Sequence, residues 1–222
     1  MLLLHGYGSK KESFYYQINY LKQFYKVTAV DFPAFGASEA PDTAWSVGDY
    51  ALWLEKFILK AGLNRPHVIA HSFGARVAIK FCATRGGQIG RLIITGGAGL
   101  VKPRSKAYIR RVNAYRRIKK LFPKYAERHF GSEEYKKLSP AMKQSYKLIV
   151  NEDLKSCAEK IENRTLLIYG ENDTTTPPRE EGETFNRLIR GSRLEIMKNC
   201  THFCFSEDAQ TFNKSVSVFL SE

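Results

Sequence analysis

The sequence predicts an α/β fold, with a mainly parallel sheet of about six strands, helices on both faces of the sheet and a small helical cap. The strongest indication is an alternation of short apolar runs with amphipathic stretches of helical length, which is typical of successive βα units. Each apolar run also ends near Gly, Asp, Ser or His, as expected where a strand passes into a loop. One long basic helical stretch interrupts this alternation, which indicates an insertion into the domain.

Six strands and five helices can be placed by this alternation. The strands are expected at Met1–Leu4, Val27–Asp31, His67–Ala70, Leu92–Thr95, Thr165–Tyr169 and Leu194–Met197. The helices are expected at Glu12–Tyr25, Ser46–Ala61, Phe73–Thr84, Arg179–Ile189 and Glu207–Leu220. Ser46 and Ser206 are predicted N-caps, because a serine hydroxyl can accept a hydrogen bond from the first helical turn. Gly62 and Gly191 are predicted helix-terminating glycines.

The insertion occupies residues 101–150 and carries nearly all of the excess charge. It holds 15 Lys and Arg against three Glu, a net charge of +12, whereas the whole chain has a formal net charge of +13. Apolar side chains recur there at spacings of three and four residues and predict one apolar helix face, formed by Tyr108, Val112, Tyr115, Ile118, Phe122 and Tyr125. Pro123 is expected to end or bend this helix near Phe122. Residues 1–100 and 151–222 are therefore predicted to form the core, and residues 101–150 a basic helical cap.

Composition excludes several classes of protein. With 43% hydrophobic and 26% charged residues, the 222-residue chain is expected to be globular rather than disordered or fibrous. Its apolar runs are far shorter than the ~20 residues that span a bilayer, and no secretory leader precedes His5, so neither a transmembrane association nor secretion is expected. The four cysteines, Cys82, Cys157, Cys200 and Cys204, show no disulfide pattern. This favours reduced thiols and a cytoplasmic location for the protein.

Ser72 is the candidate nucleophile. It lies in Ala70-His71-Ser72-Phe73-Gly74, between an expected strand and an expected helix, which is the setting of a nucleophile elbow. Small residues such as Ala70 and Gly74 suit this turn, because the backbones of strand and helix approach closely around the serine. The alternative is a serine at an ordinary turn between a strand and a helix.

A serine nucleophile needs a general base and a third group that orients the base. His202 is the candidate base, because it follows the last expected strand, at the end of the sheet where the Ser72 loop also lies. Asp173 follows the strand before that one and is the candidate acid, with Glu171 as its nearest rival. The chain order Ser72, Asp173, His202 is one of the known orders of a Ser-His-Asp triad. The remaining histidines are less well placed: His5, His67, His71 and His129.

The turn after the first expected strand is suited to stabilising an oxyanion. His5-Gly6-Tyr7-Gly8 predicts a tight turn there, with His5 and Gly6 as supporting residues. The backbone N–H groups of Tyr7 and of Phe73, which directly follows Ser72, are predicted to form the oxyanion hole.

These motifs together resemble those of the α/β-hydrolase superfamily across essentially the whole chain. The matching segments are the oxyanion turn Leu4–Gly8, the loop Asp31–Ser38, the elbow Ala70–Gly74, the acid loop Leu166–Asp173 with Pro177, and His202 with the helix that follows it. The sequence departs from the family pattern at Thr201, where glycine commonly precedes the histidine, and at its start, where the family's first two strands are expected to be missing. Without them Val27–Asp31 is expected to be an exposed sheet edge, through which the chain could form a homo-oligomer.

The resemblance implies a serine hydrolase that cleaves a carboxylic ester or thioester of a small-molecule acyl substrate through a triad and an acyl-enzyme. It implies no cofactor and no metal, and Cys200-Thr201-His202-Phe203-Cys204 lacks a second ligand pair with the spacing of a zinc site. The serine argues against those members of the fold, haloalkane dehalogenases and epoxide hydrolases, that use an aspartate nucleophile.

Three alternatives stay open. The same triad serves C–C hydrolases, amide hydrolases and lyases. The basic cap could attract an anionic or carrier-bound substrate, although a solvated basic helix face is the simpler interpretation. A non-catalytic member of the fold that binds a carrier protein or another anion is the third. Specific nucleic-acid binding is not expected, because no nucleic-acid motif accompanies the charge and the tyrosines of the insertion are more simply core contacts.

Overall fold

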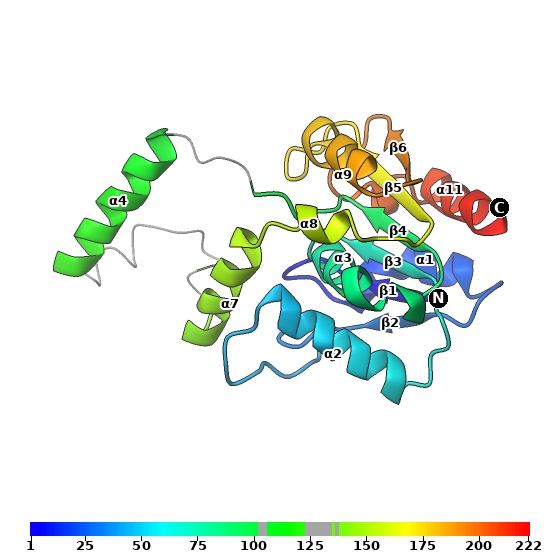
Figure 1. The fold of residues 1–222 in the computed structure, drawn as a ribbon, viewed down its shortest axis with the longest axis horizontal. Coiled ribbons are helices and arrows are strands. Elements are labelled where there is room, and N and C mark those ends of the chain that lie inside the picture. The colour runs from blue at the N-terminus through cyan, green and yellow to red at the C-terminus, as the bar shows by residue number, and fades with distance from the viewer. Residues whose placement is uncertain (102–105, 123–134, 136–137) are drawn as a thin grey trace.

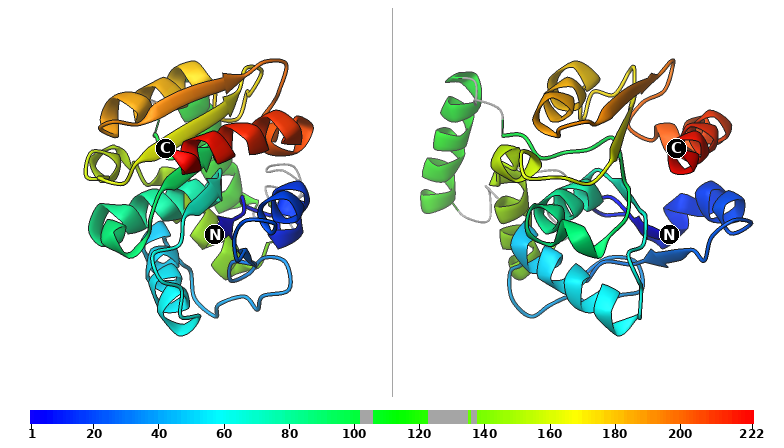
Figure 2. Two further views of the ribbon diagram at one scale, coloured as in Figure 1. Left: turned by 90° about the vertical axis from the view of Figure 1, so that its right-hand side faces the viewer. Right: turned by 45° about the vertical axis from the view of Figure 1, so that its right-hand side comes forward.

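The computed structural model describes residues 1–101, 106–122, 135 and 138–222. In this part of the chain one open sheet is covered by helices on both faces, and two further helices lie beyond the carboxyl ends of its strands (Figures 1 and 2). Tyr125 and His129 of the insertion lie outside the described residues.

The sheet is parallel throughout, in the order β2-β1-β3-β4-β5-β6. Its strands are β1 (Leu2–Leu4), β2 (Thr28–Val30), β3 (Val68–His71), β4 (Leu92–Thr95), β5 (Thr165–Gly170) and β6 (Arg193–Met197). The prediction of a mainly parallel sheet of about six strands is confirmed, and β2 is an edge strand as expected. Because the carboxyl ends of parallel strands meet at one edge of a sheet, the loops after β1, β3, β5 and β6 lie together.

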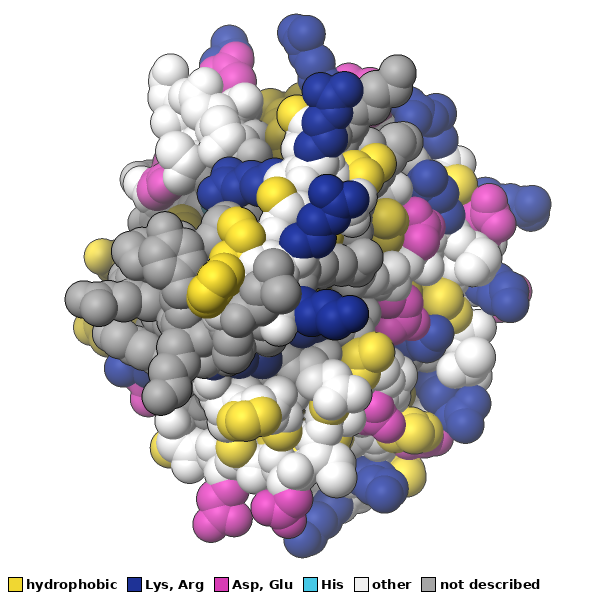
Figure 3. Space-filling view, turned by 90° about the vertical axis from the view of Figure 1, so that its left-hand side faces the viewer, with side chains coloured by type: hydrophobic (Ala, Val, Ile, Leu, Met, Phe, Trp, Pro, Cys, Tyr) yellow, Lys and Arg dark blue, Asp and Glu magenta, His cyan; other side chains and the backbone are white. Residues whose placement is uncertain are grey.

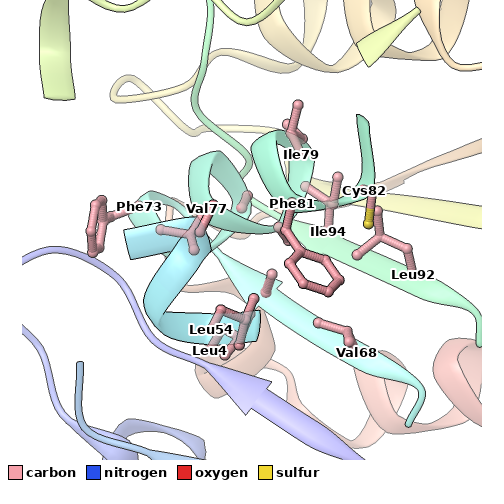
Figure 4. Packing of buried hydrophobic residues seen from close by; sticks show 14 of the residues in the cluster. Leu4, Leu54, Val68, Phe73, Val77, Ile79, Phe81, Cys82, Leu92 and Ile94 are labelled. Atoms are coloured by element: carbon pink, nitrogen blue, oxygen red, sulfur yellow. The ribbon is translucent and has the colours of Figure 1, made fainter. Parts of the chain in front are cut away.

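The strands divide their side chains between two apolar cores, as the two-residue period of a strand requires. Leu2 and Leu4 of β1 face one core and Leu3 faces the other, and all three are fully buried. The first core lies under α2 (Val47–Lys60), α3 (Phe73–Arg85), α8 (Lys155–Ala158) and α9 (Glu183–Leu188). A short 3-10 turn, η2 (Gly86–Gln88), follows α3. Figure 4 shows Val77 and Phe81 of α3 in this core. The second core lies under η1 (Lys11–Phe14), α1 (Tyr15–Leu21), α10 (Cys204–Glu207) and α11 (Ala209–Ser221).

Three helix predictions need correction. The helix expected at Glu12–Tyr25 is a 3-10 turn followed by α1, which ends at Leu21. Leu21 is the last buried side chain of this helix, and the helix ends there because helical turns that pack against nothing gain little stability. The helix expected at Arg179–Ile189 begins as the π-helical turn η3 (Pro178–Gly182) and continues as α9.

The predicted N-cap Ser206 is also wrong. Ser206 lies inside the short helix α10, and Asp208 caps α11 by accepting a hydrogen bond from the Thr211 N–H at 3.1 Å. A carboxylate at this position also interacts favourably with the positive end of the helix dipole. Ser46 does cap α2, and Asp49 completes a capping box with it.

Within the insertion the structure describes α4 (Lys106–Leu121) and α7 (Pro140–Asn151), which differ in how they contact the core. Helix α7 packs on the core through Met142, Ser145 and Ile149, and the Ser145 hydroxyl accepts a hydrogen bond from the Trp45 N–H at 2.8 Å. Helix α4 ends just before Phe122, as Pro123 predicts, and lies apart from the sheet (Figure 1). The Phe122 side chain, assigned by the sequence to the apolar face of this helix, is 64% exposed.

The four cysteines are free thiols, as the sequence predicts. Burial raises the pKa of both Cys82 and Cys204 to about 12, so these two thiols are protonated and unreactive at neutral pH. Across the ranges that the structure describes, no helix has both the length and the apolar character needed to cross a membrane.

A buried carboxylate at the end of β2 fixes the loop next to the oxyanion turn. The Asp31 carboxylate accepts hydrogen bonds from the Lys11 side chain at 2.6 Å, the Lys11 N–H at 2.7 Å and the Ala37 N–H at 3.1 Å. Gly36, with φ of +56°, packs so closely that an added Cβ would lie 2.3 Å from the Asp31 carboxyl carbon. Burial opposes ionisation of Asp31, but the Lys11 and Ala37 hydrogen bonds outweigh it and lower its pKa to about 2.

Replacing this carboxylate should destabilise the fold at neutral pH. Because the pKa of Asp31 is lowered on folding, its stabilisation is present above the ordinary value of 3.8 and is lost as the pH falls toward 2. We expect Asp31→Asn to lower the free energy of unfolding at pH 7 by about 2 kcal/mol, measured by urea denaturation. The control is Glu12→Gln, which removes an exposed carboxylate 3.3 Å from the same lysine and should change little. Equal stability of Asp31→Asn and wild type would contradict the expectation.

Candidate active site

Ser72 lies in a strained turn between β3 and α3. Its φ of 51° and ψ of −106° are unusual for a residue with a side chain, and its N–H donates to the Thr95 carbonyl at 3.1 Å. Gly74 explains why small residues are needed here: a Cβ at this position would lie 2.3 Å from the Leu4 carbonyl oxygen. The turn therefore has the tight strand-to-helix geometry that the sequence predicts.

Asp173 and His202 are hydrogen-bonded partners. The Asp173 Oδ2 lies 2.8 Å from His202 Nδ1, and the Asp173 side chain is completely buried. Glu171, the rival acid, is exposed and instead accepts a hydrogen bond from the Asn199 N–H at 3.1 Å. Of the two carboxylates, Asp173 is thus the one that the fold brings to His202.

Thr176 completes this arrangement and was missed by the sequence analysis. Its hydroxyl donates to Asp173 Oδ2 at 2.7 Å and lies 3.2 Å from His202 Nδ1, while its N–H and that of Thr175 each donate to Asp173 Oδ1 at 2.8 Å. Burial opposes ionisation of Asp173, but the bonds from His202 and Thr176 outweigh it and lower the Asp173 pKa to about 2. The available signal was the spacing, since an acid commonly accepts from groups two and three residues ahead in a turn.

No hydrogen bond joins Ser72 to His202, both of which the structure describes, but the two residues lie close together. The ring of His71, the residue before Ser72, lies 4.7 Å from the ring of His202, centroid to centroid. Thr176, bonded to Asp173, lines the same cavity as Ser72. The structure thus brings the loops that carry Ser72 and His202 together without a direct hydrogen bond between the two side chains.

The predicted oxyanion turn lies directly against the serine. A Cβ added to Gly6 would lie 3.4 Å from Ser72 Cβ, and the rings of Tyr7 and Phe73 are in edge contact at 5.8 Å. Phe73 is the first residue of α3, so its N–H has no acceptor within the helix. His5, the first residue of this turn, is joined to the loop after β2, because its buried ring accepts a hydrogen bond from the Phe32 N–H at 3.0 Å.

One cavity is lined by Ser72, and a second lies on the other side of Tyr7 and Tyr146. The cavity of about 470 Å³ that contains Ser72 lies between α3 and α7 and includes the buried charged residues Arg76 and Glu181. A second cavity, of about 770 Å³, lies between the Tyr7 turn, the Asp31–Ser38 loop and α7. Tyr7 and Tyr146 line both cavities, and their rings are in edge contact at 5.3 Å. The two cavities therefore meet at Tyr7 and Tyr146.

Comparison with known proteins agrees with this fold. The model of the "Alpha/beta hydrolase family" matches residues 1–214, so the chain belongs to that family. It is 26% identical to the 2-hydroxy-6-oxononadienedioate/2-hydroxy-6-oxononatrienedioate hydrolase 2 of Pseudomonas putida, over 88% of this chain and 77% of that protein. It is 24% identical to the pimeloyl-[acyl-carrier protein] methyl ester esterase of Neisseria meningitidis serogroup B, over 95% of this chain and 88% of that protein.

A solved structure has the same fold. An esterase from Exiguobacterium antarcticum superposes with a TM-score of 0.79 at 24% identity, covering 100% of this chain and 91% of that one. The two curated relatives described above are named as hydrolases, which agrees with the enzyme class expected from the sequence.

Removing the Thr176 hydroxyl should weaken the acid of the Asp173–His202 pair. We expect Thr176→Val to raise the pKa of Asp173 from about 2 toward its ordinary value of 3.8, because one of the hydrogen bonds that stabilise the carboxylate is lost. The free energy of unfolding at pH 7 should fall by about 1 kcal/mol. Carboxyl NMR titration measures the first change and urea denaturation the second. Thr174→Val is the control, because Thr174 is exposed, and an unchanged Asp173 titration in Thr176→Val would refute this role of the hydroxyl.

Proposed function

We propose that this chain is a serine hydrolase that cleaves a carboxylic ester or thioester through an acyl-enzyme. Ser72 is the nucleophile, His202 the general base, Asp173 the residue that orients His202, and the N–H groups of Tyr7 and Phe73 the oxyanion hole. The observation on which the proposal depends is the buried 2.8 Å hydrogen bond between Asp173 and His202 beside a serine in a strained elbow turn.

The reaction follows from these positions. Ser72 Oγ attacks the carbonyl carbon while His202 Nε2 takes its proton, and Asp173 stabilises the imidazolium that forms. The negative charge on the carbonyl oxygen is held by the two N–H groups. Collapse of this intermediate breaks the bond to the leaving alcohol or thiol, which receives the proton from His202. Water, losing a proton to His202, then attacks the acyl carbon, and as the ester bond to Ser72 breaks, His202 returns that proton to Ser72 Oγ and the acid leaves.

An ester is favoured over the other substrates that this triad can serve. The Neisseria relative is named as a methyl ester esterase and the Exiguobacterium neighbour as an esterase, whereas the Pseudomonas relative is named as a hydrolase of a different substrate. We further propose that residues 101–150 form the cap over the site, since Tyr146 and Ile149 of α7 line the Ser72 cavity. The free cysteines support a cytoplasmic location.

Ser72→Ala should abolish covalent chemistry without unfolding the protein. A fluorophosphonate probe reports an activated serine and requires no knowledge of the substrate. We expect the wild type to gain one probe mass in intact mass spectrometry and Ser72→Ala to gain none, with turnover of a simple ester lowered by at least about 10³-fold. Ser9→Ala, which changes a serine in the neighbouring cavity, should label normally. Labelling or undiminished turnover in Ser72→Ala would sink the proposal.

The charge of α4 favours an anionic substrate or an acidic carrier protein. This helix contains seven Lys and Arg and no acidic residue, and its exposed cations include Arg110, Arg111, Arg117 and Lys120. Figure 3 views the molecule from the side on which α4 lies, and Lys and Arg side chains form a row across it. A surface of one sign attracts partners of the other, and a relative is named for a carrier-bound substrate. We therefore propose substrate delivery by an acidic carrier as the second part of the function.

Neutralising these four cations should affect charged substrates alone. We expect their replacement by Gln to lower kcat/KM about 10-fold for a carrier-bound acyl ester at low salt and to leave a neutral ester unchanged. The matched control replaces four exposed lysines on other elements, Lys22, Lys26, Lys56 and Lys214. An equal loss in both variants would indicate net charge rather than a docking surface, and no loss in either would indicate a merely solvated helix.

A further inference from the structure

We propose that His71 is a positioning residue: its buried ring donates a hydrogen bond to the backbone carbonyl of His202 and so sets the location of the catalytic base relative to Ser72. The inference rests on the proposed function, because it concerns the geometry of the same site. As a candidate base His71 is poorly placed, and nothing in the proposed reaction uses its side chain.

The contacts of His71 join three of the loops that form the site. Its Nε2 lies 3.1 Å from the His202 carbonyl oxygen. It directly precedes Ser72 in the chain, and it packs so closely on the oxyanion turn that a Cβ at Gly6 would lie 2.8 Å from its Nδ1. The ring also packs on Phe205, with 4.8 Å between centroids. A side chain in this position links the nucleophile, the oxyanion turn and the base.

The hydrogen bond requires one protonation state. A carbonyl oxygen only accepts, so His71 Nε2 must bear the proton. Burial and the neighbouring His202 lower the pKa of His71 to about 3, which keeps its ring neutral throughout the neutral pH range. The neutral ring adds no positive charge beside the imidazolium that forms on His202 during the reaction, whereas a lysine or arginine donor here would oppose it.

The Asp173 hydrogen bond alone does not locate His202. It sets the direction of the ring at Nδ1, but the position of Nε2 relative to Ser72 also depends on the backbone that carries the ring. The residues before His202 are held by the Asn172 N–H, which donates to the Cys200 carbonyl at 2.8 Å, and by Glu207, which accepts from Thr201. His71 adds a contact to the carbonyl of His202 itself, and it comes from the residue that directly precedes Ser72. A displacement of about 1 Å at a reacting group can cost on the order of 10²-fold in rate.

Two substitutions separate the hydrogen bond from the packing. His71→Phe keeps an aromatic ring and removes the donor, whereas His71→Gln keeps an N–H of similar reach. We expect His71→Phe to lower kcat and the rate of fluorophosphonate labelling roughly 10- to 100-fold while KM changes less than about twofold. His71→Gln should recover a large part of both losses. His67→Gln, at the opposite end of β3, is the control and should match the wild type in both rates.

A third measurement needs no variant and no activity. Long-range ¹H–¹⁵N correlation spectra of the wild type should show His71 as the neutral tautomer with its proton on Nε2. An Nδ1–H tautomer, a His71→Phe variant as fast as wild type, or a His71→Gln variant no faster than a folded His71→Phe would each overturn the proposal. If the wild type itself is not labelled by the probe, the proposed function fails and this role fails with it; normal labelling of all variants overturns the His71 inference alone.

Discussion

The close approach of α3 to β1 at Gly74 is the constraint on which the site depends. A Cβ there would lie 2.3 Å from the Leu4 carbonyl oxygen and 2.8 Å from that of His5, and backbone atoms cannot move aside as a side chain could. This contact places the first turn of α3 on the carboxyl end of β1, so the Ser72 turn and the Tyr7 turn are brought together by main-chain packing. The unusual backbone of Ser72, which costs of the order of 1–3 kcal/mol, is the consequence.

Buried polar side chains then tie the remaining loops to this contact. His5 bonds the loop after β2 through the Phe32 N–H, Asp173 after β5 bonds His202 after β6, and His71 at the end of β3 lies within hydrogen-bond distance of the His202 carbonyl. An unpaired buried polar group costs about 1–3 kcal/mol, so the fold loses stability if one of these loops moves away and its hydrogen bond breaks. The site is thus held by pairs that connect different strands, and its geometry is a property of the whole sheet edge rather than of any single loop.

The strands and the residues that follow them could be predicted because their signals are local. Apolar runs bounded by turn residues mark β3 and β5, and Ser72 and Asp173 follow those runs in the chain. What could not be predicted depends on contacts between distant segments. The hydrogen bond between His71 and His202 spans 131 residues, and the early end of α1 reflects the lack of core beyond Leu21. The exposure of Phe122 likewise has no local signal, since an apolar helix face looks the same whether or not a partner covers it.

The same helix that begins at the serine also anchors the segment over the cavity. Arg76 lies one helical turn after Ser72, is buried, and donates to the carbonyls of Ile149 and Glu152, each at 3.0 Å, at the carboxyl end of α7. A guanidinium satisfies helix-end carbonyls and opposes the negative end of the helix dipole. Since α3 begins directly after Ser72, these hydrogen bonds hold the carboxyl end of α7, which lines the Ser72 cavity, at a fixed place relative to the serine turn.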